Sequence, residues 1–350
     1  MGKFLKASNN ILTLLETAGT VSEFARAIKA DSELRQFKKE YPEDGIILNT
    51  LGSIMTQAGL NREKVLGLPA WACTKRIRGF SIKEMEIVAC VVPEDKSVVI
   101  YYVPDVFVHE SYKFLASDFL ALFNSNIPIG CAMITGSEKK GFQGKESLTI
   151  CFSVSINYEN VSSLNRTILE NMLRNVLDIV PFLPIGLEII QTKGFESPRE
   201  ALVEAFNKAQ VIRKEKKPTA TKSKDVVFLD LVKYIKSEYP KYKIISEDEK
   251  LVFTSEANET CTRMIYVNTE NQIILETHVA KTQSLYDIQD RKQIVRFIDI
   301  VNNKLINYGK LMIDLNQNLI LYKTSIDILG AENDATHQMI NNMLIKNLAT

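Results

Sequence analysis

The sequence has little of what most catalytic and metal sites need. Among its 350 residues there are three histidines, five cysteines and one tryptophan. His109, His278 and His337 are widely scattered, none lies four residues from another, and none has a Cys-x-x-Cys motif nearby. Zinc sites and catalytic dyads require ligands or partners that converge. We therefore expect neither a metal site nor a catalytic histidine.

The five cysteines are odd in number, and most lie inside apolar strand patterns: Cys73, Cys90, Cys131, Cys151 and Cys261. A secreted disulfide scaffold normally pairs its cysteines. The pattern instead indicates reduced, buried thiols, as in a cytosolic protein. We therefore expect a cytoplasmic location.

Long hydrophobic runs and an excess of one charge are also lacking. No window approaches the length of a membrane span, and the N-terminus has no apolar stretch of the signal-peptide type. The 43 basic residues nearly balance the 42 acidic ones. A net charge of +1 creates no field that would attract nucleic acid or anionic lipid. We expect a soluble protein that binds neither nucleic acid nor membranes.

The glycine-rich stretch at residues 136–146 does not have the spacing of a phosphate-binding loop. A P-loop needs Lys directly after its second Gly, followed by Ser or Thr, at a turn from strand to helix. Here Phe142 follows Gly141, Glu146 follows Lys145, and the next element is predicted to be a strand. No Ser, Cys or Thr lies in a recognisable nucleophile turn. We therefore expect no cofactor and no enzymatic activity.

What the sequence does contain is the same module twice. The segment Asn124–Ile134, which contains Gly130, resembles Asn303–Ile313, which contains Gly309, at an offset of 179. Each segment follows an amphipathic helix and leads into a strand. At this offset the apolar residues of the two helices match as three pairs: Leu115 with Ile294, Phe119 with Ile298, and Leu122 with Val301.

The match continues towards the C-terminal side of each copy. Phe152–Ile156 matches Tyr322–Ile326 at an offset of 170, so the first copy carries nine extra residues in a loop at 136–145. Ile168–Leu173 then matches Met339–Leu344 at an offset of 171. We predict that both copies have one fold and one strand order, with Gly130 and Gly309 at positive φ.

Each copy is predicted to consist of a helix, several strands, a helix, two strands and a closing helix. Short hairpin turns within the strand groups, such as residues 93–96 and 268–271, favour antiparallel pairing. We divide the chain into an N-terminal extension of short helices at 1–45, a first domain at 46–194, a helix and basic linker at 195–224, and a second domain at 225–350. Pro42 and Gly45 are expected to end the extension, and Ser22 and Ser32 to cap its helices.

This repeat resembles the YbjN domain, which shares its fold with the type III secretion chaperones. The resemblance is clearest in residues 225–350, where Leu305–Asp314 follows a central helix and is followed by the strand Leu319–Thr324 and a closing helix. It implies an α+β fold, with helices on a twisted antiparallel sheet. In that family single domains commonly form dimers, so the tandem copies would form an internal pseudo-dimer. The association of whole chains into a homo-oligomer stays open.

The resemblance also implies a function without catalytic residues, because the secretion chaperones hold extended segments of client proteins. We therefore predict a non-enzymatic adaptor or chaperone-like module that binds a protein partner. A folded sheet can accept an extended peptide at an exposed edge. The alternative is a small-molecule sensor or an enzyme with a site between the two domains, which convergent polar groups in a large pocket would favour.

The candidate partner-contact residues are Trp71, Val106, Phe107 and Val108. Tryptophan is enriched at protein interfaces, and Pro104 would interrupt a strand's hydrogen bonds at a sheet edge and leave residues 106–108 facing a partner. The alternative for all four residues is burial in the core.

Overall fold

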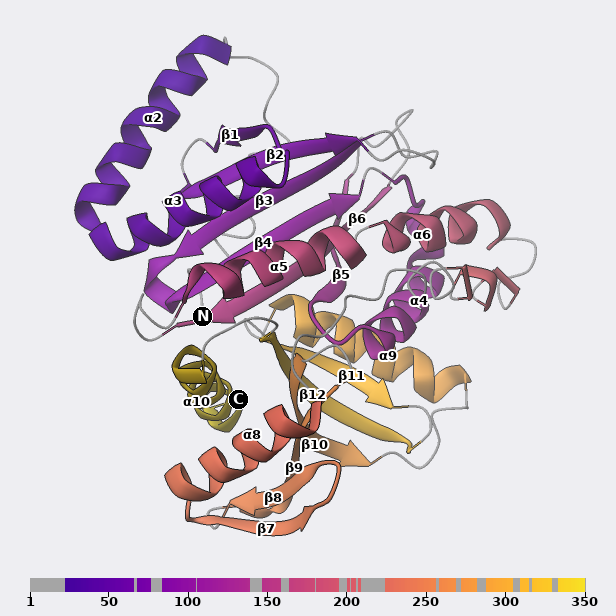
Figure 1. Ribbon diagram of the computed structural model, residues 1–350. Helices are drawn as coiled ribbons and strands as arrows, with labels where there is room; N and C mark the ends of the chain where they lie inside the picture. Colours follow the sequence, from indigo (N-terminus) through magenta and orange to yellow (C-terminus); the bar gives the residue numbers. More distant parts are fainter. Residues whose placement is uncertain are drawn as a thin grey trace.

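The computed structural model describes most of the chain (Figure 1). The described residues are 23–65, 68–76, 84–104, 106–138, 147–158, 164–179, 181–194, 200–201, 203–205, 207–208, 224–255, 258–268, 272–281, 288–304, 309–314, 317–328 and 333–349. They form two antiparallel sheets packed by helices, preceded by a helical segment. The prediction of an α+β fold with two repeated sheets is confirmed.

The first sheet has six strands, in the order β1-β2-β3-β4-β6-β5. Its strands are β1 (Arg62–Lys64), β2 (Ala70–Arg76), β3 (Glu84–Val92), β4 (Ser97–Pro104), β5 (Cys131–Glu138) and β6 (Ser147–Asn157). The predicted turn between β3 and β4 is a short 3-10 helix, Pro93–Asp95, that ends at Lys96 with φ 45°.

The second sheet repeats this topology strand for strand, in the order β7-β8-β9-β10-β12-β11. Its strands are β7 (Tyr242–Glu247), β8 (Leu251–Ser255), β9 (Asn258–Val267), β10 (Gln272–Lys281), β11 (Lys310–Asp314) and β12 (Leu319–Asp327). All pairs in both sheets are antiparallel. The predicted repetition of one strand order is therefore confirmed.

Three helices recur in both copies. The recurring pairs are α3 (Pro42–Gln57) with α8 (Lys224–Glu238), α4 (Lys113–Asn126) with α9 (Ile288–Lys304), and α5 (Arg166–Ile179) with α10 (Asn333–Ala349). A 3-10 turn, Glu110–Tyr112, precedes α4. Helix α2 (Glu23–Glu40), in the N-terminal extension, and α6 (Phe182–Lys193), at the end of the first copy, are not part of these three pairs.

The N-terminal segment differs in detail from its prediction. The short helices expected after Ser22 and after Ser32 are one continuous helix, α2, so Ser32 lies within it and caps nothing. Pro42 begins α3 instead of ending a region. Proline suits the first turn of a helix because the N–H it lacks would have no partner there. Residues 1–22, including Ser22, lie outside the described part.

Gly130 and Gly309 have φ values of 82° and 81°, as predicted. In each copy an asparagine at the end of the preceding helix bonds in both directions to the second residue after the glycine: Asn124 to Ala132, and Asn302 to Leu311. Asn302 and not Asn303 is thus the equivalent of Asn124. The offset within these helices is 178, because one more residue separates Asn302 from Gly309 than separates Asn124 from Gly130. The helix pairings at an offset of 179 are therefore wrong by one residue, whereas this offset is correct from the glycines onward.

The two copies contact each other through equivalent elements. Helix α4 packs on α9 and β11, and α9 packs on β5 (Figure 1). At this boundary Ser125 Oγ donates to the carbonyl oxygen of Ile313 (3.0 Å), and the buried Lys310 Nζ donates to that of Ile127 (2.7 Å). The largest apolar cluster contains buried side chains from both copies. The copies therefore share one continuous core.

Several predicted segments lie partly or wholly outside the described residues. These are the basic linker before Lys224 and most of the 136–145 loop. In the predicted connecting helix, the described residues between 200 and 208 are helical, and Ala201 and Ala205 are buried. No helix in the described part of the chain is long and apolar enough to cross a membrane.

Candidate functional site

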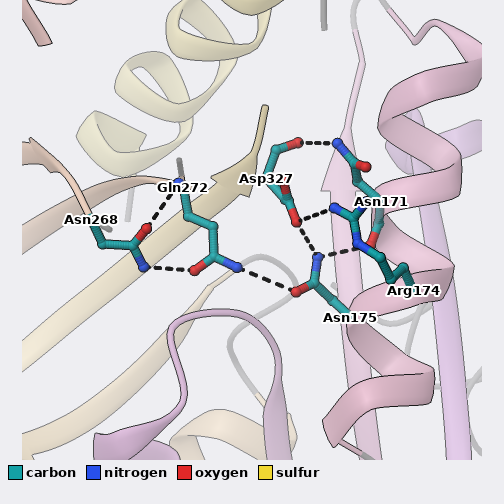
Figure 2. A network of polar contacts seen from close by, with 6 residues as sticks. All are labelled: Asn171, Arg174, Asn175, Asn268, Gln272 and Asp327. Carbon is teal, nitrogen blue, oxygen red and sulfur yellow. Dashed lines mark hydrogen bonds and ion pairs between the residues drawn. The ribbon is translucent and has the colours of Figure 1, made fainter. Parts of the chain in front are cut away.

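A network of polar side chains crosses the boundary between the two copies (Figure 2). Asp327, the last residue of β12, is buried, and its Oδ2 accepts hydrogen bonds from Arg174 Nη2 (2.9 Å) and Asn175 Nδ2 (2.7 Å). Asn171 Nδ2 donates to the backbone oxygen of Asp327 (3.1 Å). The three donors lie on one face of α5 because they are three and four residues apart.

The network extends onto the start of β10. Gln272 Nε2 donates to Asn175 Oδ1 (3.3 Å), and Gln272 Oε1 accepts from Asn268 Nδ2 (2.7 Å). Because Gln272 and Asp327 are direct cross-strand partners, one sheet presents both to α5. Hydrogen bonds and a guanidinium engage Oδ2 and the backbone oxygen of Asp327, so these atoms make a structural contact across the boundary.

An equivalent contact on the other side of the boundary has no charged groups. Asn342 of α10, the equivalent of Asn171, donates to the backbone oxygen of Asn157 (3.3 Å), the equivalent of Asp327. The two asparagine contacts are therefore reciprocal, whereas the ion pair occurs once. The sequence repeat contains a signal for these two contacts, because Asn171 and Asn342 are asparagines at equivalent, buried positions. Sequence reasoning missed Arg174, Asn175 and Gln272, which have no equivalents of like chemistry.

A small cavity lies beside this network. It is lined by apolar residues from β6 and α5, and by the polar residues Ser155, Asn175, Ser325 and Asp327. Its volume is about 10 Å³, roughly enough for one water molecule. A cavity of this size gives no support to the alternative of a small-molecule site between the domains.

Three cysteine thiols are too deeply buried to act as nucleophiles. Burial raises the pKa of Cys90, Cys131 and Cys151 to about 12. Their thiols stay protonated at neutral pH, and the thiolate is the reactive form. Within the described residues no three His, Cys, Asp or Glu side chains are grouped so that they could hold a metal ion.

Two of the four candidate partner-contact residues are buried in the first copy. Trp71, on β2, donates its Nε1–H to the carbonyl oxygen of Leu48 (2.7 Å), and the Arg62 guanidinium lies 4.1 Å from its ring centre. Val108 is buried, and its carbonyl oxygen accepts from Leu148 N (2.8 Å). Both side chains are buried, so neither is available on the surface.

The other two candidates, Val106 and Phe107, are half-buried. Val106 packs against the core, and the Phe107 ring centre lies 6.4 Å from that of His109. Strand β4 lies inside the sheet, between β3 and β6, but Pro104 itself pairs only with Met85 of β3. The pairing of β4 with β6 ends at Tyr102, so the missing N–H of Pro104 leaves no β6 carbonyl without a donor.

Among the described residues, a sheet end with exposed side chains along its outer strand lies in the second copy. Strand β7 is the outermost strand of its sheet and has six residues, whereas the equivalent strand β1 has three and lies beside α2. Along β7 half-buried and exposed residues alternate, and Ile245 is 59% exposed. An ion pair between Lys236 and Glu247 (2.5 Å) ties the end of β7 to α8.

Comparisons with known proteins do not add an identity to this geometry. A scan against protein-family models finds no match, and a search of the curated proteins also finds none. The resemblance to the YbjN domain and the secretion chaperones therefore stays an expectation from the sequence.

Proposed function

We propose that the chain is a non-enzymatic protein-binding module that holds an extended segment of a partner protein, as an adaptor or a chaperone does. The observation that carries the proposal is the outer edge of β7, the end strand of its sheet. An edge strand presents backbone N–H and C=O groups that another chain can pair with. The tandem copies occupy each other's contact surfaces, as in an internal pseudo-dimer, and leave this edge on the outside.

In this mechanism the partner segment adds a seventh strand next to β7. Backbone hydrogen bonds would supply affinity, and the alternation of side chains would supply specificity. Ile245 and its exposed neighbours Lys243 and Glu247 alternate with residues that face the core. A partner segment with an apolar residue beside Ile245, flanked by charges opposite to those of Lys243 and Glu247, would match this edge.

The test is to select binders from a random peptide library on the purified full-length chain, and then to measure amide hydrogen exchange with and without a selected peptide. Strand addition should slow exchange at those amides of β7 that point away from β8, because only these N–H groups can pair with an added strand. Strand β1 is the internal control, and its exchange should not change.

Two results would contradict the proposal. One is a library that yields no binder at all. The other is a set of binders that protects amides elsewhere and leaves those of β7 unchanged.

A further inference from the structure

Helix α9 carries apolar side chains on a face that nothing in the described part of the chain covers. Phe297 is 54% exposed and Ile300 is 42% exposed. They lie three residues apart and so share one side of the helix. The opposite side of α9 packs on the sheet, where Val295 and Ile298 are buried in a cluster with residues of β11 and β12. We call the exposed face, Phe297 and Ile300, the outer face of α9.

The repeat identifies what the equivalent face does in the first copy. The reciprocal bonds of Asn124 and Asn302 fix the alignment of the two helices. Phe119 is five residues before Asn124, and Phe297 is five before Asn302. Phe119 and Phe297 are therefore equivalent phenylalanines, but Phe119 is fully buried.

The element that buries Phe119 is α6. A Cβ atom added at Gly186, in the middle of α6, would lie only 2.1 Å from Cζ of Phe119, so the ring packs directly against the glycine backbone. The face of α6 is apolar, with buried Leu183, Leu187 and Ile190. In Figure 1, α4 lies between α6 and α9. No helix among the described residues of the second copy takes the place of α6.

The charges around the outer face are basic. Arg296 and Lys292 are exposed, and the Lys292 ammonium lies 4.8 Å from the ring centre of Phe114. The nearby carboxylate of Asp299 is directed to the first copy, where it accepts a bond from Ile134 N (3.4 Å). A helix docked here would meet positive charge at its border, and acidic residues would complement it.

We propose that the outer face of α9 binds a helix of a partner protein, in the position that α6 takes on α4. The helix has one apolar side, a glycine or alanine opposite Phe297, and acidic residues at its border. Docking an amphipathic helix is a recognition mode distinct from strand addition. The inference thus concerns a second surface and stands independently of the β7 edge.

The probe is a fluorescent synthetic peptide with the sequence of residues 181–194, which contains α6, titrated into the full-length chain by anisotropy. Saturable binding is expected. Phe297→Asp in the chain should weaken it at least tenfold, because a carboxylate replaces the ring that the peptide covers. Gly186→Leu in the peptide should weaken it comparably, because leucine fills the space that the ring needs. The matched control is Val226→Asp, on the exposed side of α8, which should leave the affinity unchanged.

Three outcomes would overturn the proposal. The first is the absence of saturable binding at millimolar peptide. The second is binding that Phe297→Asp does not change while the thermal melt confirms that the variant is folded, since the peptide would then occupy another site, such as α4. The third is a chain that sediments as a dimer and becomes a monomer with Phe297→Asp, which would assign the outer face to a second copy of this chain.

Discussion

Arg174 and Asp327 form an ion pair across the boundary between the two copies, with 2.9 Å between Nη2 and Oδ2. The carboxylate is buried, whereas the guanidinium is partly exposed. A buried carboxylate is costly without partners. Asn175 also donates a hydrogen bond to this carboxylate, and Asn171 donates one to the backbone oxygen of Asp327. This contact joins the first copy's α5 to the second copy's sheet, beside the packing of α4 on α9 and β11.

The first prediction concerns this contact. Replacing Asp327 by Ala should lower the free energy of unfolding by about 1.5–3 kcal/mol, the range for hydrogen bonds to charged groups, as measured by urea denaturation. The control is Asn157→Ala at the equivalent position, where the boundary contact uses the backbone oxygen only, and its loss should be smaller. Equal losses at the two positions would show that the ion pair does not hold the copies together.

The second prediction concerns the two equivalent glycines. Gly130→Ala and Gly309→Ala should each cost at least about 1–2 kcal/mol, because a positive φ is unfavourable for residues with a Cβ. The new Cβ would also lie 2.8 Å from the Ser153 oxygen or 2.6 Å from the Lys323 oxygen. Gly136→Ala is the control, since its Cβ would meet nothing within 4 Å. Thermal melts in which all three variants match the parent would contradict the assignment.

The third prediction is a pH dependence at Asp299. Burial raises the pKa of its carboxyl above the ordinary value of 3.8. The folded state therefore binds the proton more tightly than the unfolded state does. As the pH rises from 3.8 to the raised pKa, ionisation of Asp299 lowers the free energy of unfolding. Above the raised pKa this loss of stability is complete and stays constant. Asn keeps an acceptor for Ile134 N without the charge.

Asp299→Asn should therefore be more stable than the parent at pH 7, and the difference should vanish as the pH falls below 3.8. Denaturation at a series of pH values measures it. A difference that is constant across this series would show that the charge of Asp299 is not its cause.

The fourth prediction distinguishes core from surface among the candidate contact residues. Val108→Asp should unfold the chain or lower its melting temperature severely, because it buries a carboxylate without a partner. Val279→Asp places the same change on an exposed position of β10 and should have little effect. If Val108→Asp melts like the parent, the segment around Val108 opens to solvent and becomes a candidate partner surface again.

The sequence was sufficient to predict the repeat and its fold because both depend on local patterns. Apolar periodicity and hairpin turns specify the strands, and a helix-to-strand turn at positive φ requires residues such as Gly130 and Gly309. The register of the helices was harder. One extra residue between Asn302 and Gly309 gives Asn302 the role of Asn124. An alignment through the glycines therefore pairs Phe119 with Ile298 instead of Phe297.

The contacts between the copies could not be predicted, because they depend on how two finished surfaces meet. Asn175 and Arg174 look like ordinary polar positions on an amphipathic helix, and only the approach of β12 gives them Asp327 as a partner. For Trp71 the sequence suggested a contact with a partner where the structure has a contact within the chain. A single tryptophan suggests an interface, but the neighbouring α3 supplies a carbonyl for its N–H and places it in the core.

The most direct measurement of the proposed protein-binding role is site-specific photo-crosslinking to a library-selected peptide. A photoreactive residue replaces Ile245 on β7 or, as the matched control, Ile46 on α3, which is equally exposed at 59%. A peptide that pairs with the edge of β7 should crosslink at position 245 and not at position 46. Crosslinking at position 46 alone, or equally at both positions, would contradict the assignment of the β7 edge as the partner site.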